Sequence, residues 1–130
     1  MKSATLERRA SQFINGIDTN ALRETINAVR ADPSKAQTKF SVKTDWLGGG
    51  VSRTRIDGYK IGGQRVERKF EFIVDEPHEL CGTNTAANPQ EYLQGALNAC
   101  MMMGYVACSS LFGVELESVS IETEGNIDLR

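Results

Sequence analysis

Three cysteines, Cys81, Cys100 and Cys108, carry the most distinctive chemistry in this chain of 130 residues. A deprotonated thiol is both a nucleophile and a metal ligand, and an ordinary cysteine thiol has a pKa of about 8.5. A free cysteine is also among the residue types most often buried, where it packs like a small hydrophobic side chain. The residues around each cysteine therefore have to indicate which of these roles it fills.

Cys100 lies in a stretch that predicts one long helix over residues 89–111. Asn88 is a favourable N-cap, Pro89 suits the first helical position, and Glu91 follows the cap by three residues, as in a capping box. At about 100° per residue, one side of this helix is apolar or small, and we expect Cys100 at the centre of this buried stripe. A cysteine that only packs fits the same periodicity. The stripe consists of Leu93, Ala96, Leu97, Cys100, Met103, Gly104, Ala107 and Leu111.

The predicted helix resembles the central helix of the OsmC/Ohr family of thiol peroxidases in the ordered run Asn88-Pro89, Tyr92-Leu93, Ala96-Leu97 and Cys100. Segments 82–84 and 113–125 extend the resemblance, which covers roughly residues 38–130. In that family the cysteine that matches Cys100 attacks peroxides. The resemblance implies an α+β fold, in which an antiparallel sheet curls around a long, apolar central helix. It also implies an intertwined homodimer in which two such helices pack together.

The resemblance also implies which residues assist the thiol. In the family, an arginine from the N-terminal strand region favours the thiolate, and a glutamate in the first turn of the central helix holds that arginine. Arg53 and Arg55 both match the arginine, and the choice between them stays open. Ten residues before Cys100, Gln90 stands where the family has the glutamate, and it cannot form a charge-assisted pair. Glu91, the next residue, falls on the helix side opposite Cys100.

Two functions follow from this comparison. The first is a thiol peroxidase that reduces organic hydroperoxides and is restored by a dithiol reductant. The second is an OsmC-like binding or structural stress protein that keeps the fold without efficient turnover, and Gln90 favours it. Cys108 cannot resolve an oxidised Cys100, because eight helical residues span about 12 Å and a disulfide allows only about 7 Å between Cα atoms. Cys81 lies on a predicted loop, from which a thiol can reach Cys100.

Short strands are predicted between the N-terminus and the helix. Residues 38–47 alternate in polarity, a glycine turn follows at 48–50, and residues 51–56 and 66–74 read as further strands. Asp57-Gly58 and Gly62-Gly63 are both strong turn signals. Three strands joined by short turns predict an antiparallel meander.

The two ends of the chain are predicted separately. Residues 1–36 are expected to form an N-terminal helical arm, with a short helix around 13–17 and a second over about 20–31, capped by Asp18 or Thr19. Residues 37–130 are the expected OsmC-like domain. Residues 114–129 predict a strand, and in the family further strands and a second long helix follow. The C-terminal part of the domain, with the family's resolving cysteine, is therefore expected to be missing.

Composition excludes several other functions. The 15 basic and 17 acidic side chains give a net charge of −2, which argues against a nucleic-acid surface. No apolar run reaches the ~18 residues of a membrane span, and the absence of a signal peptide with an odd cysteine count predicts a cytoplasmic protein with reduced thiols. His78 and Cys81 lack the further ligands of a zinc site, and Gly48-Gly49-Gly50 lacks the residues of a phosphate loop. We expect no metal, no cofactor, and a second copy as the protein partner.

Overall fold

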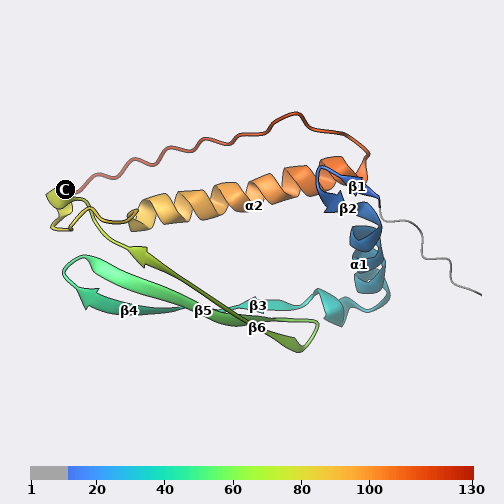
Figure 1. Cartoon of the computed structure of the whole chain (residues 1–130), viewed down its shortest axis with the longest axis horizontal. Helices are drawn as coiled ribbons and strands as arrows, with labels where there is room; N and C mark the ends of the chain where they lie inside the picture. The colour runs from blue at the N-terminus through green and yellow to red at the C-terminus, as the bar shows by residue number, and fades with distance from the viewer. Residues whose placement is uncertain (1–11) are drawn as a thin grey trace, which may run out of the picture.

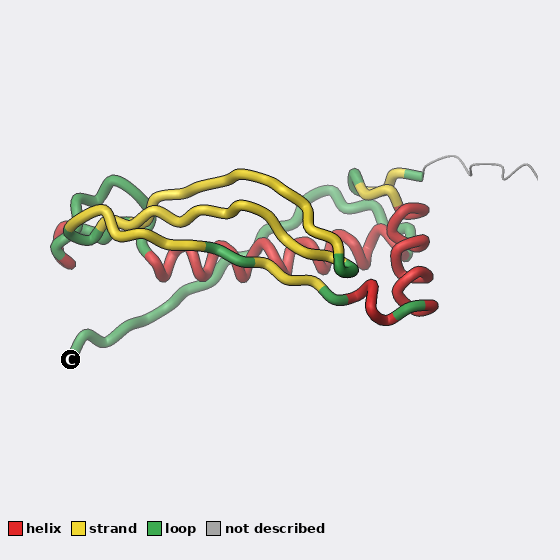
Figure 2. The backbone as a smooth tube through the Cα atoms, turned by 90° about the horizontal axis from the view of Figure 1, so that it is seen from below, coloured by secondary structure: helices red, strands yellow, loops and turns green. Residues whose placement is uncertain are grey.

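A computed structural model describes residues 12–130 of the chain as an α+β arrangement of antiparallel strands and two helices. The long helix α2 (Pro89–Leu111) lies above the main sheet, and α1 (Thr19–Ala31) stands across one end (Figure 1). The chain after α2 returns as an extended segment on the far side of that helix from the sheet. Seen from below, the strands run along the length of the molecule, as α2 does (Figure 2). The predicted fold class is confirmed at this level.

The main sheet is built around its longest strands, β5 (Val51–Ile61) and β6 (Gln64–Val74), which pair as a hairpin. On the other side of β5 lie β3 (Thr38–Phe40) and β4 (Lys43–Gly48), end to end. All pairings are antiparallel, so the predicted meander is confirmed. The single strand predicted over 38–47 is interrupted between β3 and β4.

The turn predicted at Asp57-Gly58 is wrong, because β5 continues through it. The register of β5 against β6 shifts between Ile56 and Gly58, so these residues form a β-bulge. Gly58 is buried, and a Cβ atom there would lie 2.5 Å from the carbonyl oxygen of Val66. The glycine therefore permits a close approach of two strands, while Gly62-Gly63, with φ values of 52° and 80°, makes the hairpin turn.

The short helix predicted around residues 13–17 is also wrong in the described part, and residues 1–11 lie outside it. Two small strands, β1 (Phe13–Ile14) and β2 (Ile17–Asp18), form a hairpin instead. Asn15 and Gly16 between them have φ values of 52° and 76°, the positive values that an Asn-Gly hairpin turn requires. The second predicted helix is confirmed as α1: the Asp18 side chain accepts hydrogen bonds from the backbone of Asn20 and Ala21. A 3₁₀ turn, η1 (Pro33–Ala36), leads from α1 into the sheet.

Helix α2 begins as predicted. The Asn88 side chain accepts a hydrogen bond from Glu91 N at 2.9 Å, and the Glu91 carboxylate accepts one from Asn88 N at 2.8 Å. Near this end, the ring of Tyr92 stacks on that of Phe72 with 4.7 Å between centroids, and its hydroxyl donates to the carbonyl of Ile73. This contact identifies the sheet face carrying Phe72 as the one that looks toward α2.

The burial expected for the helix stripe is wrong for the single chain. Cys100 is exposed, and so are Leu93 and Leu97, at 72% and 54%. Within residues 12–130 no hydrophobic side chain is fully buried. The chain exposes 10861 Å², whereas a compact monomer of its mass exposes about 6,800 Å². Residues 1–11 account for at most about 1,800 Å² of the excess, the surface of an extended chain of their mass. The physical reason is that α2 stands away from most of the sheet.

The strand predicted over 114–129 is not formed. The segment is extended, but its backbone from residue 115 onward makes no backbone–backbone hydrogen bond to the described chain. It is held by side chains: the Asn15 amide bonds Val114 O and Leu116 N, and the Asn98 amide donates to Ile121 O. The sequence has strand character, but among residues 12–130 no other strand lies beside it.

The loop from β6 to α2 is organised by one buried carboxylate. Asp75 accepts hydrogen bonds from the backbone and hydroxyl groups of Thr83 and Thr85, and from Glu76 N. Its own N–H donates to Ala87 O at 3.2 Å. The loop also contains the 3₁₀ turn η2 (His78–Leu80). The bonds from Thr83 foremost, then Thr85, hold the pKa of Asp75 well below its usual value.

We predict that Asp75→Asn lowers the melting temperature by several degrees at pH 7. The NH₂ group of asparagine would face the N–H and O–H donors of Thr83 and Thr85 and could not accept their hydrogen bonds. A carboxylate with a lowered pKa stabilises the fold above its unfolded pKa of about 3.9, and loses that effect as pH falls through the folded pKa. The difference between wild type and variant should therefore shrink below about pH 4. Thermal unfolding followed by circular dichroism between pH 7 and pH 2 measures it. A difference that stays constant down to pH 2 contradicts the assignment.

Candidate functional site

All three thiols are free and exposed, so none is bonded to another. Cys100 lies near the middle of α2, within the unburied apolar stripe. Cys108 lies two turns further along the same helix. Cys81 follows η2 with a left-handed backbone, at a φ of 64°. The reactive thiol predicted at Cys100 is therefore accessible from solvent in the single chain.

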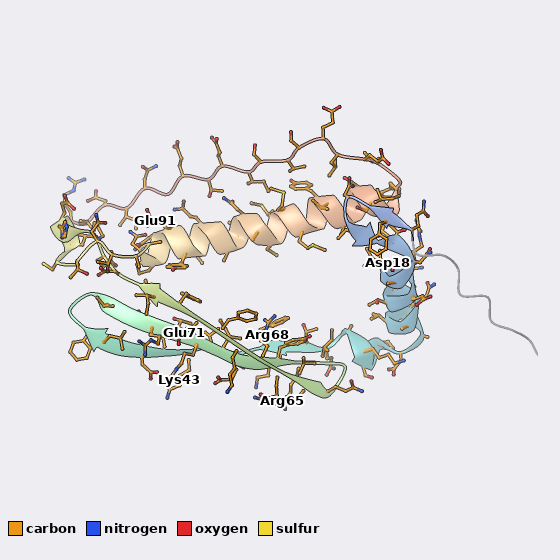
Figure 3. All side chains as sticks on the ribbon, viewed as in Figure 1. Asp18, Lys43, Arg65, Arg68, Glu71 and Glu91 are labelled. Carbon is orange, nitrogen blue, oxygen red and sulfur yellow. The ribbon has the colours of Figure 1, made fainter. Side chains whose placement is uncertain are left out.

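The two candidate arginines point away from α2. In register, Thr54 of β5 lies opposite Phe72, so both share the face that looks toward the helix. Neighbouring residues of a strand point to opposite faces, which places Arg53 and Arg55 on the outer face. Figure 3 shows Lys43, the direct partner of Arg55 on β4, on that outer side. Within one chain, neither arginine is turned toward Cys100.

The structure distinguishes the two arginines in another way. Arg55 is exposed, and its guanidinium forms an ion pair with Asp45 on the neighbouring strand. Arg53 is half-buried, and its Nε is buried without a hydrogen-bond partner in the described chain. An unsatisfied buried donor costs free energy, so it identifies a position where an acceptor is missing. Arg53 is thus the one of the pair with an unmet donor.

The first turn of α2 separates the roles of Gln90 and Glu91. The Glu91 carboxylate is used in the capping box, which leaves it a structural role. Gln90 is half-buried, and its Oε1 is a buried acceptor without a donor in the described chain. Gln90 borders a hollow of about 590 Å³ between the start of α2 and residues 124–129. An unmet acceptor on α2 and an unmet donor on β5 are therefore present but not joined in one chain.

Arg68 is a cation on the otherwise apolar inner face of β6. It shares the face of Phe70 and Phe72 on β6, and its guanidinium carbon lies 4.9 Å from the ring centre of Tyr59 and 5.6 Å from that of Phe70. Figure 3 shows it on the side of the sheet toward α2. Among the described arginines of the sheet, it alone has this orientation. The signal in the sequence is a charged residue at one of the positions that are otherwise apolar in an alternating strand.

An open apolar hollow lies beside the N-terminal half of α2, where the helix contacts β6. Its volume is about 510 Å³, within the range of small-molecule sites, and Ala96 lies one helical turn before Cys100. It is lined by Phe72, Ala87, Glu91, Tyr92, Gly95 and Ala96. The lining is mostly apolar, so the hollow suits an apolar group.

Two further properties bear on the chemistry of the described residues. Across residues 12–130, no three His, Cys, Asp or Glu side chains are grouped so that they could share a metal ion. Neither helix there has the length and hydrophobicity of a membrane span.

Comparison with known proteins leaves the family of this chain open. A scan against models of protein families gives no match, and a search of curated proteins gives no significant match. The resemblance to the OsmC/Ohr family therefore depends on the ordered residues of α2 and its flanking segments, together with the accessible Cys100.

Proposed function

We propose that this chain is an OsmC-like thiol peroxidase in which Cys100 reduces organic hydroperoxides. The observation that carries the proposal is an accessible thiol at the middle of a long helix, surrounded by exposed apolar side chains. Leu97 and Met103, three residues to either side, are 54% and 52% exposed. Such surroundings accept the organic group of a hydroperoxide and leave the sulfur within reach of the O–O bond.

The reaction proceeds in two stages. The Cys100 thiolate attacks the outer peroxide oxygen, the O–O bond breaks, and the released alkoxide takes up a proton and leaves as an alcohol. The sulfur is thereby oxidised to a sulfenic acid. A second thiol, from the reductant or from another cysteine, then displaces water to form a disulfide, and a dithiol reductant supplies the two electrons that restore both thiols.

The proposal includes a homodimer, in which a second copy of the chain covers the exposed apolar surface. The α2 stripe and the facing sheet surface are both apolar and uncovered, with Phe40, Trp46 and Phe70 between 62% and 76% exposed. An isologous dimer covers the same surface on both copies. It also offers strand edges to residues 115–130, whose backbone makes no backbone–backbone hydrogen bond within the described chain. The resemblance implies that Arg53 or Arg55 meets Gln90 in the assembled protein, a contact that one chain does not make.

One observation favours a second function, an OsmC-like binding or structural stress protein without efficient turnover. Gln90 stands where the family has a glutamate, and the nearby Glu91 carboxylate is occupied by the helix cap. A neutral amide holds a guanidinium less strongly than a carboxylate does. A thiol assisted by such a pair reacts more slowly, and the first two tests below measure by how much.

The first prediction concerns the thiol itself. Cys100→Ser should lower the second-order rate of tert-butyl hydroperoxide reduction at least about 100-fold, because the nucleophile is removed. Cys108→Ser, the same change on the same helix, should leave the rate within about twofold. A dithiol-coupled assay gives the rates, and mass spectrometry after mild peroxide treatment locates the first sulfenic acid. First oxidation at Cys108 contradicts the proposal, and equal inactivity of all variants and wild type favours the binding or structural protein.

The second prediction concerns Gln90. Gln90→Glu should raise the rate constant roughly fivefold, equal to about 1 kcal/mol, because a charge-assisted bond to an arginine replaces a neutral one. Gln94→Glu adds the same charge one turn later, beside the same hollow as Gln90, and shows whether a charge elsewhere along that hollow has the same effect. Stopped-flow measurement with excess hydroperoxide gives both constants. Equal rates for the two variants and wild type would mean that no arginine lies beside position 90.

The third prediction concerns assembly. Wild-type protein should be a dimer at micromolar concentration, with an interface above about 2,000 Å², typical of obligate dimers. Leu97→Glu should dissociate or unfold it, because a charge would be buried in the stripe. Tyr105→Glu changes a side chain 60% exposed on another side of α2 and should preserve the dimer. Light scattering decides the question: a folded, monodisperse monomer of wild-type protein excludes the dimer.

A further inference from the structure

A row of three cations crosses the outer face of the sheet, on the side away from α2. In register, Lys39 of β3 lies directly opposite Lys60 of β5, and Lys60 lies directly opposite Arg65 of β6. Directly opposed like charges destabilise a sheet. Arg65 has a carboxylate partner in Glu67, but neither lysine has an ion-pair partner in the described part of the chain.

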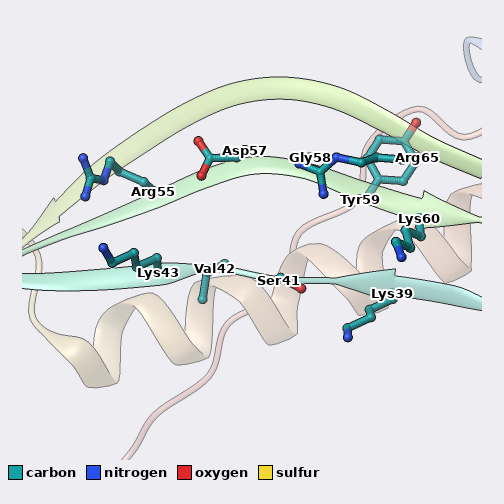
Figure 4. A pocket seen from close by; sticks show the side chains of 10 residues that line it. All are labelled: Lys39, Ser41, Val42, Lys43, Arg55, Asp57, Gly58, Tyr59, Lys60 and Arg65. Atoms are coloured by element: carbon teal, nitrogen blue, oxygen red, sulfur yellow. The ribbon is translucent and has the colours of Figure 1, made fainter.

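The row borders a hollow of about 370 Å³. The hollow lies where the sheet is irregular on both sides: β3 and β4 are interrupted at Ser41 and Val42, and β5 carries the bulge at Asp57 and Gly58. Figure 4 shows Lys39, Lys60 and Arg65 at one end, Lys43 and Arg55 at the other, and Asp57 between them.

The charges at the two ends are not equivalent. Lys43 and Arg55 share the carboxylate of Asp45, which neutralises much of that end. The end with Lys39, Lys60 and Arg65 has one paired carboxylate, Glu67, for three cations and so keeps more positive charge, although the whole chain has a net charge of −2. Asp57 lies three residues from Lys60, about 10 Å along the strand. The hollow therefore presents cations at one end and an anionic hydrogen-bond acceptor in its middle.

We propose that this hollow binds a small phosphorylated polyol, such as a sugar phosphate. The phosphate lies between Lys39 and Lys60, where it relieves their repulsion, and Arg65 can add a guanidinium contact. Hydroxyl groups of the ligand reach the middle of the hollow, where Asp57 accepts their hydrogen bonds and the Ser41 hydroxyl can bond them. A long polyanion is disfavoured, because its next phosphate would approach Asp57. The site is independent of Cys100, since it lies on the opposite face of the sheet.

Titration calorimetry with glucose 6-phosphate at low ionic strength tests the proposal. Wild-type protein should bind it saturably, and Lys60→Gln should weaken binding at least tenfold. The same variant, without ligand, should melt at the same or a slightly higher temperature, because the repulsion on both sides of position 60 is gone. A general loss of structure cannot produce this combination. Lys69→Gln removes an equal charge from β6 outside the hollow and should bind as wild type does.

Binding of glucose and of inorganic phosphate, each measured alone, shows how much the sugar and the phosphate contribute. Glucose and inorganic phosphate should each bind at least tenfold more weakly than glucose 6-phosphate, and Asp57→Asn should reduce that preference over phosphate. No saturable binding of glucose 6-phosphate, or equal binding by wild type and Lys60→Gln, overturns the proposal. Binding of inorganic phosphate as tight as that of the sugar phosphate shows an adventitious ion only. Binding of a single-stranded oligonucleotide but not of the sugar phosphate assigns the face to nucleic acid instead.

Discussion

Apolar surface that one chain cannot bury is the constraint on which the rest of this structure depends. Helix α2 contacts the sheet through Tyr92, which stacks on Phe72, and beyond that contact both surfaces stay exposed. Hydrophobic burial is the dominant favourable term in folding, so an arrangement with no fully buried hydrophobic side chain in residues 12–130 needs another surface to cover it. The proposed assembly and the environment of Cys100 are therefore linked, because the same stripe is involved in both.

Strand alternation divides the sheet into two chemically different faces. The inner face carries aromatic side chains and Arg68, and the outer face carries the opposed cations Lys39, Lys60 and Arg65. The bulge at Gly58 lets β5 keep this division along eleven residues, while it opens a hollow on the outer side. Cys100 on α2 and the outer hollow lie on opposite sides of the sheet, although Arg55, one of the two candidate arginines, lines that hollow.

At the start of α2, the neighbouring residues Gln90 and Glu91 differ in whether their side-chain oxygens are already bonded. Glu91 stabilises the helix because its carboxylate accepts a hydrogen bond from Asn88 N in the capping box. That carboxylate is then occupied by the cap. Gln90, one residue earlier, keeps a buried and unpaired oxygen, and Arg53 keeps a buried and unpaired Nε. A donor and an acceptor that each lack a partner are costly alone and compatible together. The two groups are not joined within one chain.

Local interactions let the sequence determine the cap and length of α2, the Asp18 cap of α1, the Gly62-Gly63 turn and the meander. Each depends on residues close together in the chain. Only the tertiary structure decided the bulge at Gly58. Glycine is needed there because the Val66 carbonyl of the neighbouring strand lies too close for a Cβ atom. Likewise, strand-type residues at 114–129 cannot form a ladder without a neighbour, and periodicity cannot say whether the stripe around Cys100 is covered. Pairing and burial depend on what lies across from a residue, which its own neighbours in sequence do not specify.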